Sequence, residues 1–185
     1  MVWIIAGVLV LLVLFFIVTY NSLIVLRQRV RNAWAQVDVQ LKRRYDLIPN
    51  LVSTVQGYMT HERETFEQIT KARSQAMNAS DPAESAQAES QLTGTLRTLF
   101  AVAENYPELK ADQNFRELQK ELSDTESKIA YARQFYNDIV QKFNTRIHVF
   151  PTVLIAGLLG FTERSFFNLE EGSVEREAVQ VSFDR

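Results

Sequence analysis

Residues 115–150 read FRELQKELSDTESKIAYARQFYNDIVQKFNTRIHVF, and their apolar side chains recur at heptad spacing. One series falls every seven residues and a second lies between its members: Phe115, Leu122, Ile129, Tyr136, Phe143 and Phe150, with Leu118, Thr125, Ala132, Ile139 and Arg146. Spacings of three and four residues place these positions on one stripe of an α-helix. The pattern predicts a helix from about Lys110 to Phe150, roughly 60 Å long. Its apolar stripe requires partner helices.

The same spacing predicts a first long helix on the N-terminal side. Its stripe consists of Val30, Trp34, Val37, Leu41, Ile48, Leu51, Val55 and Tyr58, and it continues through Phe66, Ile69, Ala72 and Ala76 to about Met77. Arg44 occupies one position of this stripe. Pro49 lies inside it and predicts a kink or a short break at residues 47–50, because proline removes one helical hydrogen bond and clashes with the preceding turn.

A third helix is expected between the two long ones. Asp81 is a suitable N-cap and Pro82 a suitable first residue. The stripe that follows is Leu92, Leu96, Leu99, Ala103 and Tyr106, and Pro107 disfavours helix in the residue before it. Short turns between long helices predict antiparallel neighbours. The fold class is therefore all-α, an up-and-down bundle of long coiled-coil-like helices behind one transmembrane helix.

The transmembrane helix is predicted from residues 2–18, VWIIAGVLVLLVLFFIV, within a stretch that has no Asp, Glu, His, Lys or Arg before Arg27. A helix over residues 2–20 rises ~28 Å, close to the hydrocarbon thickness of a bilayer. A signal peptide would carry positive charge before the run and a cleavage site after it, and neither is present. Arg27, Arg29 and Arg31 follow instead, as candidate contacts to lipid headgroups. By the positive-inside rule, the N-terminus lies outside and the body in the cytoplasm.

Composition divides the chain into four expected parts. Residues 1–26 are the anchor, and residues 27–150 form a cytoplasmic helical bundle. Residues 151–167 are apolar but too short to span a bilayer; they dock on the bundle or the membrane, or bind another subunit. Residues 168–185 contain five Asp or Glu against two Arg and form an acidic tail, mostly disordered.

Several classes of chemistry lack the residues that they require. There is no cysteine, which excludes thiolate catalysis and cysteine metal sites. His61-Glu62 suggests a zinc protease, but that motif needs a second histidine where Thr65 stands. No glycine-rich phosphate loop or nucleophile elbow occurs. A net charge of -2 argues against nucleic acid. We therefore expect no enzyme activity and no cofactor.

Short motifs throughout the chain resemble the bacterial LemA family of membrane-anchored proteins. They are Tyr20-Asn21, residues 34–52 (WAQVDVQLKRRYDLIPNLV), His61-Glu62, Ala72-Arg73, residues 104–107 (ENYP), Ala132-Arg133, Tyr136-Asn137 and Phe150-Pro151. The resemblance implies a helical bundle on one N-terminal helix in the bacterial inner membrane, without known catalytic activity. Family members associated with magnetosome formation, and discussed beside membrane metalloproteases, favour scaffold or adaptor roles.

The candidate interaction residues fall in two of these motifs: Arg43, Arg44, Asp46, Pro49 and Asn50 in the first, and Tyr106 and Pro107 in the second. Arg44 is expected in a buried ion pair, with Asp138 or Glu104 as the acid, or else in an anionic-ligand site. The Tyr106-Pro107 turn either stops a helix or binds a partner.

Three functions remain open. The leading one is a non-enzymatic, self-assembling scaffold at the cytoplasmic face of the inner membrane. The second is an adaptor or regulator of another membrane protein such as a protease. The third is a lipid-binding or membrane-shaping module that uses the basic residues and the apolar segment. The expected partners are membrane lipids and a second copy of the chain, with other membrane proteins as further candidates.

Overall fold

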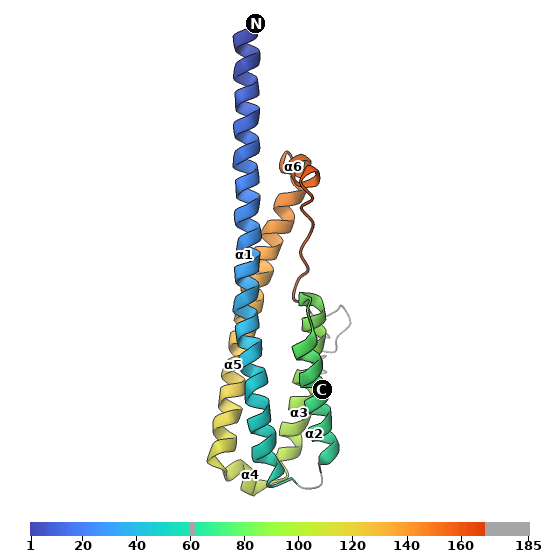
Figure 1. Ribbon diagram of the computed structural model, residues 1–185. Coiled ribbons are helices and arrows are strands. Elements are labelled where there is room, and N and C mark those ends of the chain that lie inside the picture. Colours follow the sequence, from blue (N-terminus) through green and yellow to red (C-terminus); the bar gives the residue numbers. More distant parts are fainter. Residues whose placement is uncertain (60–61, 169–185) are drawn as a thin grey trace, which may run out of the picture. The chain divides into compact units, whose positions relative to one another are not determined.

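The computed structural model describes residues 1–59 and 62–168, and every regular element in these ranges is a helix (Figure 1). The elements are α1 (Val2–Gln56), α2 (Arg63–Asn78), α3 (Pro82–Ala103), α4 (Pro107–Ala111), α5 (Gln113–His148) and α6 (Thr152–Leu158). The predicted all-α fold class is confirmed. The chain divides into two compact units, unit 1 (Met1–Pro49 and Glu117–Phe166) and unit 2 (Asn50–Arg116 and Phe167–Arg185), which are described separately.

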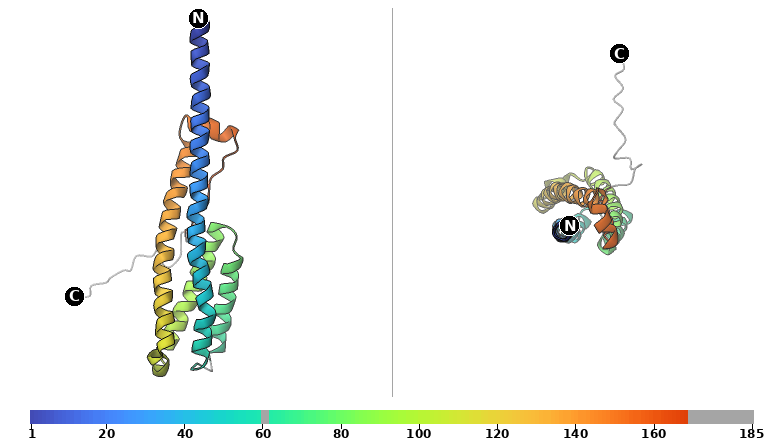
Figure 2. Two further views of the ribbon diagram at one scale, coloured as in Figure 1. Left: turned by 60° about the vertical axis from the view of Figure 1, so that its left-hand side comes forward. Right: turned by 90° about the horizontal axis from the view of Figure 1, so that it is seen from above.

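Unit 1 is built on two antiparallel helices, α1 and α5, which lie side by side in Figures 1 and 2. The tilted rings of Trp34 and Tyr136 join the two helices, with centroids 5.2 Å apart. The buried side chains along them are Leu23, Val30, Ala33, Val37, Leu41, Tyr45 and Ile48 from α1, and Leu122, Thr125, Ile129, Tyr136, Ile139, Val140, Phe143 and Ile147 from α5. The predicted stripes therefore form most of this core.

The burial predicted from the heptad pattern is wrong at the C-terminal end of α5. Arg146 is exposed and Ile147 is buried in its place, while Phe150 lies beyond the helix and is 79% exposed. A straight helix has 3.6 residues per turn, so a strict seven-residue repeat drifts by about 20° per heptad. The buried stripe therefore moves to Val140 and Ile147. A pattern extrapolated over five heptads misplaces its last members.

The first long helix also ends earlier than predicted. α1 continues without a break through Pro49, whose side chain is exposed, so the expected short break is wrong. The helix ends at Gln56, before Gly57, and α2 is a separate helix rather than its continuation to Met77. In the turn, the amides of Tyr58 and Met59 both donate to the Val55 carbonyl. Glycine is a poor helix former and favours an end there.

Unit 2 contains α2 and α3 as an antiparallel pair (Figure 2). The predicted stripes are buried: Phe66, Ile69, Ala72 and Ala76 in α2, and Leu92, Leu96, Leu99 and Ala103 in α3. Asp81 is the N-cap of α3, since its Oδ1 accepts a hydrogen bond from the Ala83 amide at 2.8 Å, and Pro82 is the first helical residue. Both predictions about this cap are confirmed.

The predicted start of the last long helix, near Lys110, is replaced by two helices. α4 ends at Ala111, Asp112 is extended, and α5 begins at Gln113. Asp112 stabilises the new start, because its Oδ1 accepts a hydrogen bond from the Phe115 amide at 2.8 Å. An aspartate followed by two polar residues is a capping signal that the heptad count overlooked.

Within the described residues, α1 is the helix long and apolar enough to cross a membrane. An 18-residue window of it has a mean hydropathy of 3.1, and residues 1–18 are all exposed. This arrangement is compatible with a membrane anchor. Two predictions lie outside the described residues: any role of His61, and the acidic tail beyond Asn168.

Candidate interaction surfaces

The three arginines that follow the apolar run occupy different environments. Arg27 is half-buried, and its guanidinium carbon lies 5.5 Å from the centroid of the Phe161 ring, a cation–π distance. Arg29 and Arg31 are exposed. Of the predicted headgroup contacts, Arg29 and Arg31 are thus accessible, whereas Arg27 also holds the chain segment that follows α6.

Arg44 is buried, with 4% of its surface exposed, as its place in the stripe predicts. Its guanidinium Nη1 lies 2.9 Å from Oε2 of Glu126 on α5, and the Glu126 side chain is 52% exposed. The acid in this pair is Glu126 rather than the expected Asp138 or Glu104. Glu126 stands one residue after Thr125, which is itself a stripe residue, and so it flanks the buried face. The pair joins α1 to α5 and leaves its acidic end in solvent.

The other residues of the first motif lie on the surface. Arg43, Asp46 and Pro49 are exposed in unit 1, and Asn50 is exposed as the first residue of unit 2. The carbonyl of Asn50 accepts a hydrogen bond from the Thr54 hydroxyl at 2.9 Å. These side chains stay candidates for contact with a partner, and Arg44 is the one that belongs to the core.

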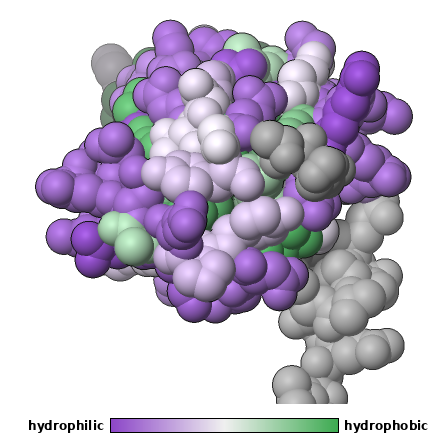
Figure 3. Space-filling view, turned by 90° about the horizontal axis from the view of Figure 1, so that it is seen from below, coloured by the Kyte–Doolittle hydropathy of each residue, from purple (hydrophilic) through white to green (hydrophobic). Residues whose placement is uncertain are grey.

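The second motif forms the turn between α3 and α4 in unit 2. Tyr106 is half-buried, and exposed Pro107 begins α4. An ion pair between Lys110 and Glu104 closes the turn. Figure 3, a view from below, shows largely hydrophilic side chains on the face at which α4 lies. These features fit the structural interpretation of the turn, with Leu109 as its buried apolar residue.

Tyr58 adds one titratable contact to this region of unit 2. Its hydroxyl donates a hydrogen bond to Oδ2 of Asp112 at 3.1 Å. This bond and the carboxylate charge favour the protonated phenol, so they raise the pKa of Tyr58 above its ordinary value of 10.0. Asp112 thus uses one oxygen for Tyr58 and the other for the cap of α5.

Sequence reasoning missed a groove of about 830 Å³ that runs along α1 and α5 in unit 1. We call it the α1–α5 groove. It is lined by Gln36, Val39 and Gln40 of α1 and by Asp124, Ser127, Lys128, Tyr131, Ala132 and Phe135 of α5. Large apolar side chains on it are open to solvent: Val39 is 61% exposed, Tyr131 79% and Phe135 43%. The available signal was an aromatic pair spaced i, i+4 outside the heptad stripe.

Gln40, one of the residues that line this groove, has an unsatisfied polar group. In the part of the chain that the structure describes, its side-chain Oε1 is buried and has no hydrogen-bond partner. An unpaired buried acceptor costs free energy, because it has lost its bond to water.

The apolar segment after α5 folds back on unit 1. Residues 149–162 contain no ionisable side chain, include α6, and are here called the hook. Thr152, Ile155 and Ala156 are buried, and the Phe161 ring lies 6.4 Å from that of Phe143. The chain then returns along α5, where the Tyr136 hydroxyl donates to the Ser165 carbonyl at 2.8 Å. The expectation that the segment docks on the bundle agrees with these contacts.

The remaining histidine that the structure describes takes part in a surface pair. Nε2 of His148 lies 2.6 Å from Oε1 of Glu163. Within residues 1–59 and 62–168, no group of three or more His, Asp or Glu side chains is placed to hold a metal ion. The described surface thus offers the apolar α1–α5 groove and a partly docked apolar hook, besides a groove of about 880 Å³ in unit 2 whose large apolar lining side chains, Met59 and Phe66, are buried.

Comparison with known proteins yields one family and several relatives. The LemA family model matches residues 33–183. Protein LemA of Metamycoplasma hominis is 29% identical over 163 residues, which cover 88% of this chain and 74% of that protein. Magnetosome protein MamQ 2 of Paramagnetospirillum magneticum is 23% identical over 174 residues, and MamQ of Magnetospirillum gryphiswaldense is 21% identical over 175 residues. The matches to these two cover 80% of this chain and 64% of each MamQ protein. Because the family model spans most of the chain and the resemblance of the motifs agrees with it, this chain belongs to the LemA family.

Proposed function

We propose that this protein is a non-enzymatic scaffold, anchored by α1 in the bacterial inner membrane, that assembles with copies of itself at the cytoplasmic face. The observation that carries the proposal is the α1–α5 groove, which exposes Val39, Tyr131 and Phe135 on the same helix pair that continues into the apolar run. Exposed apolar patches of this kind mark protein interfaces. The exposed Arg29 and Arg31 support the cytoplasmic orientation.

The charges of the groove favour a second copy as the occupant. Asp124 and Lys128 both line it and stand one helical turn apart on α5. In a dimer with a two-fold axis, the same surface meets itself, and residue i of one copy faces residue j of the other. Since both anchors enter the same membrane, the two α5 helices run in the same direction, and the long Lys128 side chain of each copy would reach Asp124 of its neighbour, one helical turn away.

The absence of cysteine makes a direct test possible. Ser127 lines the groove between Asp124 and Lys128, whereas exposed Ala130 on the same helix does not line it. We expect a short bifunctional maleimide, added to native membranes, to join two copies of the Ser127→Cys protein and to leave the Ala130→Cys protein monomeric. Equal joining of both variants, or of neither, would contradict assembly through the groove.

Charge reversal sharpens the same test. In the Ser127→Cys background, Lys128→Asp should reduce the dimer yield severalfold, because two acids then face each other. Adding Asp124→Lys should restore the yield, since the pairs are rebuilt with exchanged signs. Capture of another membrane protein by Ser127→Cys, without self-crosslinking, would overturn self-assembly in favour of the adaptor function.

A further inference from the structure

The hook carries apolar surface that its docking on unit 1 does not cover. Its buried side chains, Thr152, Ile155 and Ala156, occupy one side of α6. Leu154 is 67% exposed and Leu158 is 78% exposed, and Phe150, just before the helix, is 79% exposed. A short helix that is apolar on both sides does not suit a surface that faces water.

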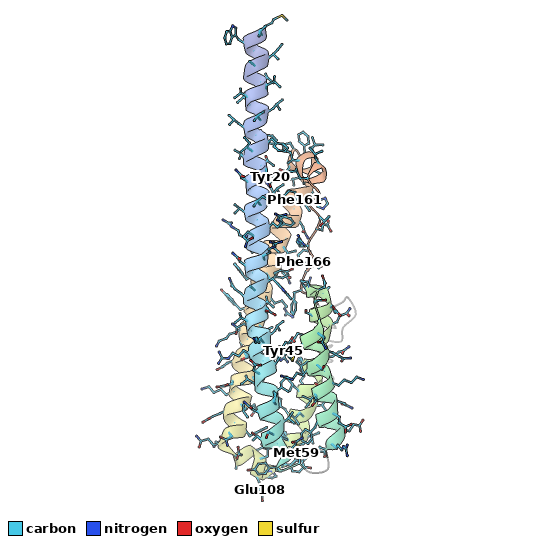
Figure 4. The ribbon with its side chains drawn as sticks, in the orientation of Figure 1. Tyr20, Tyr45, Met59, Glu108, Phe161 and Phe166 are labelled. Carbon is cyan, nitrogen blue, oxygen red and sulfur yellow. The ribbon has the colours of Figure 1, made fainter. Side chains whose placement is uncertain are left out.

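The place of the hook along α1 indicates what covers this surface. α6 lies beside α1 in Figures 1 and 2, and Figure 4 shows Tyr20 beside it with Phe161 just below. Residues 1–18 of α1 are all exposed, whereas Thr19 and Leu23 are buried. The hook and the end of α5 are the elements beside this stretch of α1. The hook therefore stands where the apolar run ends.

In unit 1, residues with charged or titratable side chains begin at the same height along α1 on three chain segments. On α1, the first Asp, Glu, His, Lys or Arg after the apolar run is Arg27, which contacts the Phe161 ring of the hook. The last residue of these types before the hook is His148 and the first one after it is Glu163, and these two are paired at 2.6 Å. On one side of this level, all three segments lack residues of these types. A boundary of this kind matches the border between headgroups and acyl chains.

We propose that the hook is a second membrane contact, which inserts Leu154, Leu158 and Phe150 into the interfacial layer of the same leaflet that α1 enters. The proposal rests on the proposed anchoring of α1. Because α1 and the hook enter the bilayer together, the tilt and rotation of unit 1 are fixed at the membrane surface, which one helix alone does not fix. The scaffold then presents its α1–α5 groove in the membrane plane in one orientation.

The test uses the full chain in vesicles of phosphatidylethanolamine and phosphatidylglycerol, with one environment-sensitive fluorophore on one introduced cysteine. Leu158→Cys reports the hook, and Ala130→Cys is the control, because both side chains are exposed in unit 1 and Ala130 does not line the α1–α5 groove. The Leu158 label should show blue-shifted emission and severalfold stronger quenching by lipids brominated near the headgroup. The Ala130 label should emit as in water.

A third label separates failure of the hook from failure of the anchor. Leu9→Cys lies in the apolar run and should be quenched by lipids brominated deep in the acyl chain. If Leu9 is quenched while Leu158 behaves like Ala130, the hook proposal is wrong and anchoring stands. If Leu9 is not quenched, the anchor itself fails, and the hook proposal with it. Protection of Leu158 without lipid quenching would assign the hook to a protein contact and overturn the proposal.

Discussion

The two units differ in how many of their large apolar side chains are exposed. In the described part of unit 2, the large apolar side chains left exposed are Tyr58 at 37% and Met77 at 52%. Unit 1 exposes the whole N-terminal run of α1, the aromatic pair of the groove and the leucines of the hook. Unit 2 also has a groove, of about 880 Å³, but its large apolar lining side chains, Met59 and Phe66, are buried. Unit 1 exposes more apolar surface, and the proposed function rests on that surface.

Polar contacts differ between the units as well. In unit 2, Asp81 caps α3, Asp112 caps α5, and Lys110 pairs with Glu104 across a turn, whereas the Tyr58–Asp112 hydrogen bond joins two segments. In unit 1 they join separate segments: Arg44 to Glu126, Arg27 to Phe161, and Asn144 to Arg164, whose amide donates to Asn144 Oδ1 at 2.9 Å. The difference suggests that substitutions in unit 2 change stability, whereas exposed substitutions in unit 1 change location and assembly.

A matched leucine pair tests this division with the largest expected effect. Leu92 of unit 2 is fully buried, and Leu158 of unit 1 is 78% exposed. Leu92→Ala should lower the free energy of local unfolding by about 2–5 kcal/mol, because it leaves a cavity. Leu158→Ala should change it by less than about 0.5 kcal/mol. Hydrogen exchange of the full chain in lipid nanodiscs measures both. An equal loss in both variants would remove the distinction between the units.

The Arg44–Glu126 pair tests whether contacts between helices stabilise unit 1. Glu126→Gln should cost about 1–2 kcal/mol, since a buried guanidinium loses a charged acceptor while water replaces part of it at the half-exposed end. The double variant Arg44→Met with Glu126→Gln should recover most of this loss, because the buried cation is gone. Glu121→Gln, at an exposed position of α5, is the control and should change stability little.

The single variant Arg44→Met separates the two interpretations of that arginine. If the protein stays folded and membrane-bound and keeps its cellular effect, Arg44 serves the fold. Loss of the cellular effect from a folded, membrane-bound protein would contradict the structural role and indicate an anionic ligand.

Much of the fold could be predicted because periodicity records burial directly. The stripe through Leu122, Ile129, Tyr136 and Phe143 is buried as counted. The errors arise where local chemistry or geometry overrides the count. Gly57 ends α1, Asp112 starts α5 anew, and the drift between 3.6 and 3.5 residues per turn exchanges Arg146 for Ile147.

The candidate site was less predictable, because it depends on pairing between segments. The sequence showed that Arg44 needs an acid but not which one, since Glu126, Asp138 and Glu104 are equivalent until the register of the helices is known. The α1–α5 groove is formed by Val39 and Phe135, which lie far apart in the sequence. The apolar composition of the hook was visible, whereas its level beside Tyr20 required the fold.

The smallest effect is expected at Tyr58 and Asp112, where unit 2 has one of its exposed apolar side chains. The raised pKa of Tyr58 means that the folded chain keeps a proton that the unfolded chain releases near pH 10.0. The free energy of unfolding should therefore fall as the pH rises from about 10 towards the raised pKa, and this contribution is fully present below that range. Tyrosinate absorbance, as the difference from Tyr58→Phe, measures the pKa. Asp112→Asn removes the charge but keeps a side-chain oxygen that can cap α5, so it should return the pKa of Tyr58 towards 10.0 and leave the helices intact. A Tyr58 that titrates near 10.0 with Asp112 in place would show that this hydrogen bond does not persist in solution. Tyr58 would then be an exposed aromatic side chain without this bond, like the exposed aromatic side chains of the groove in unit 1.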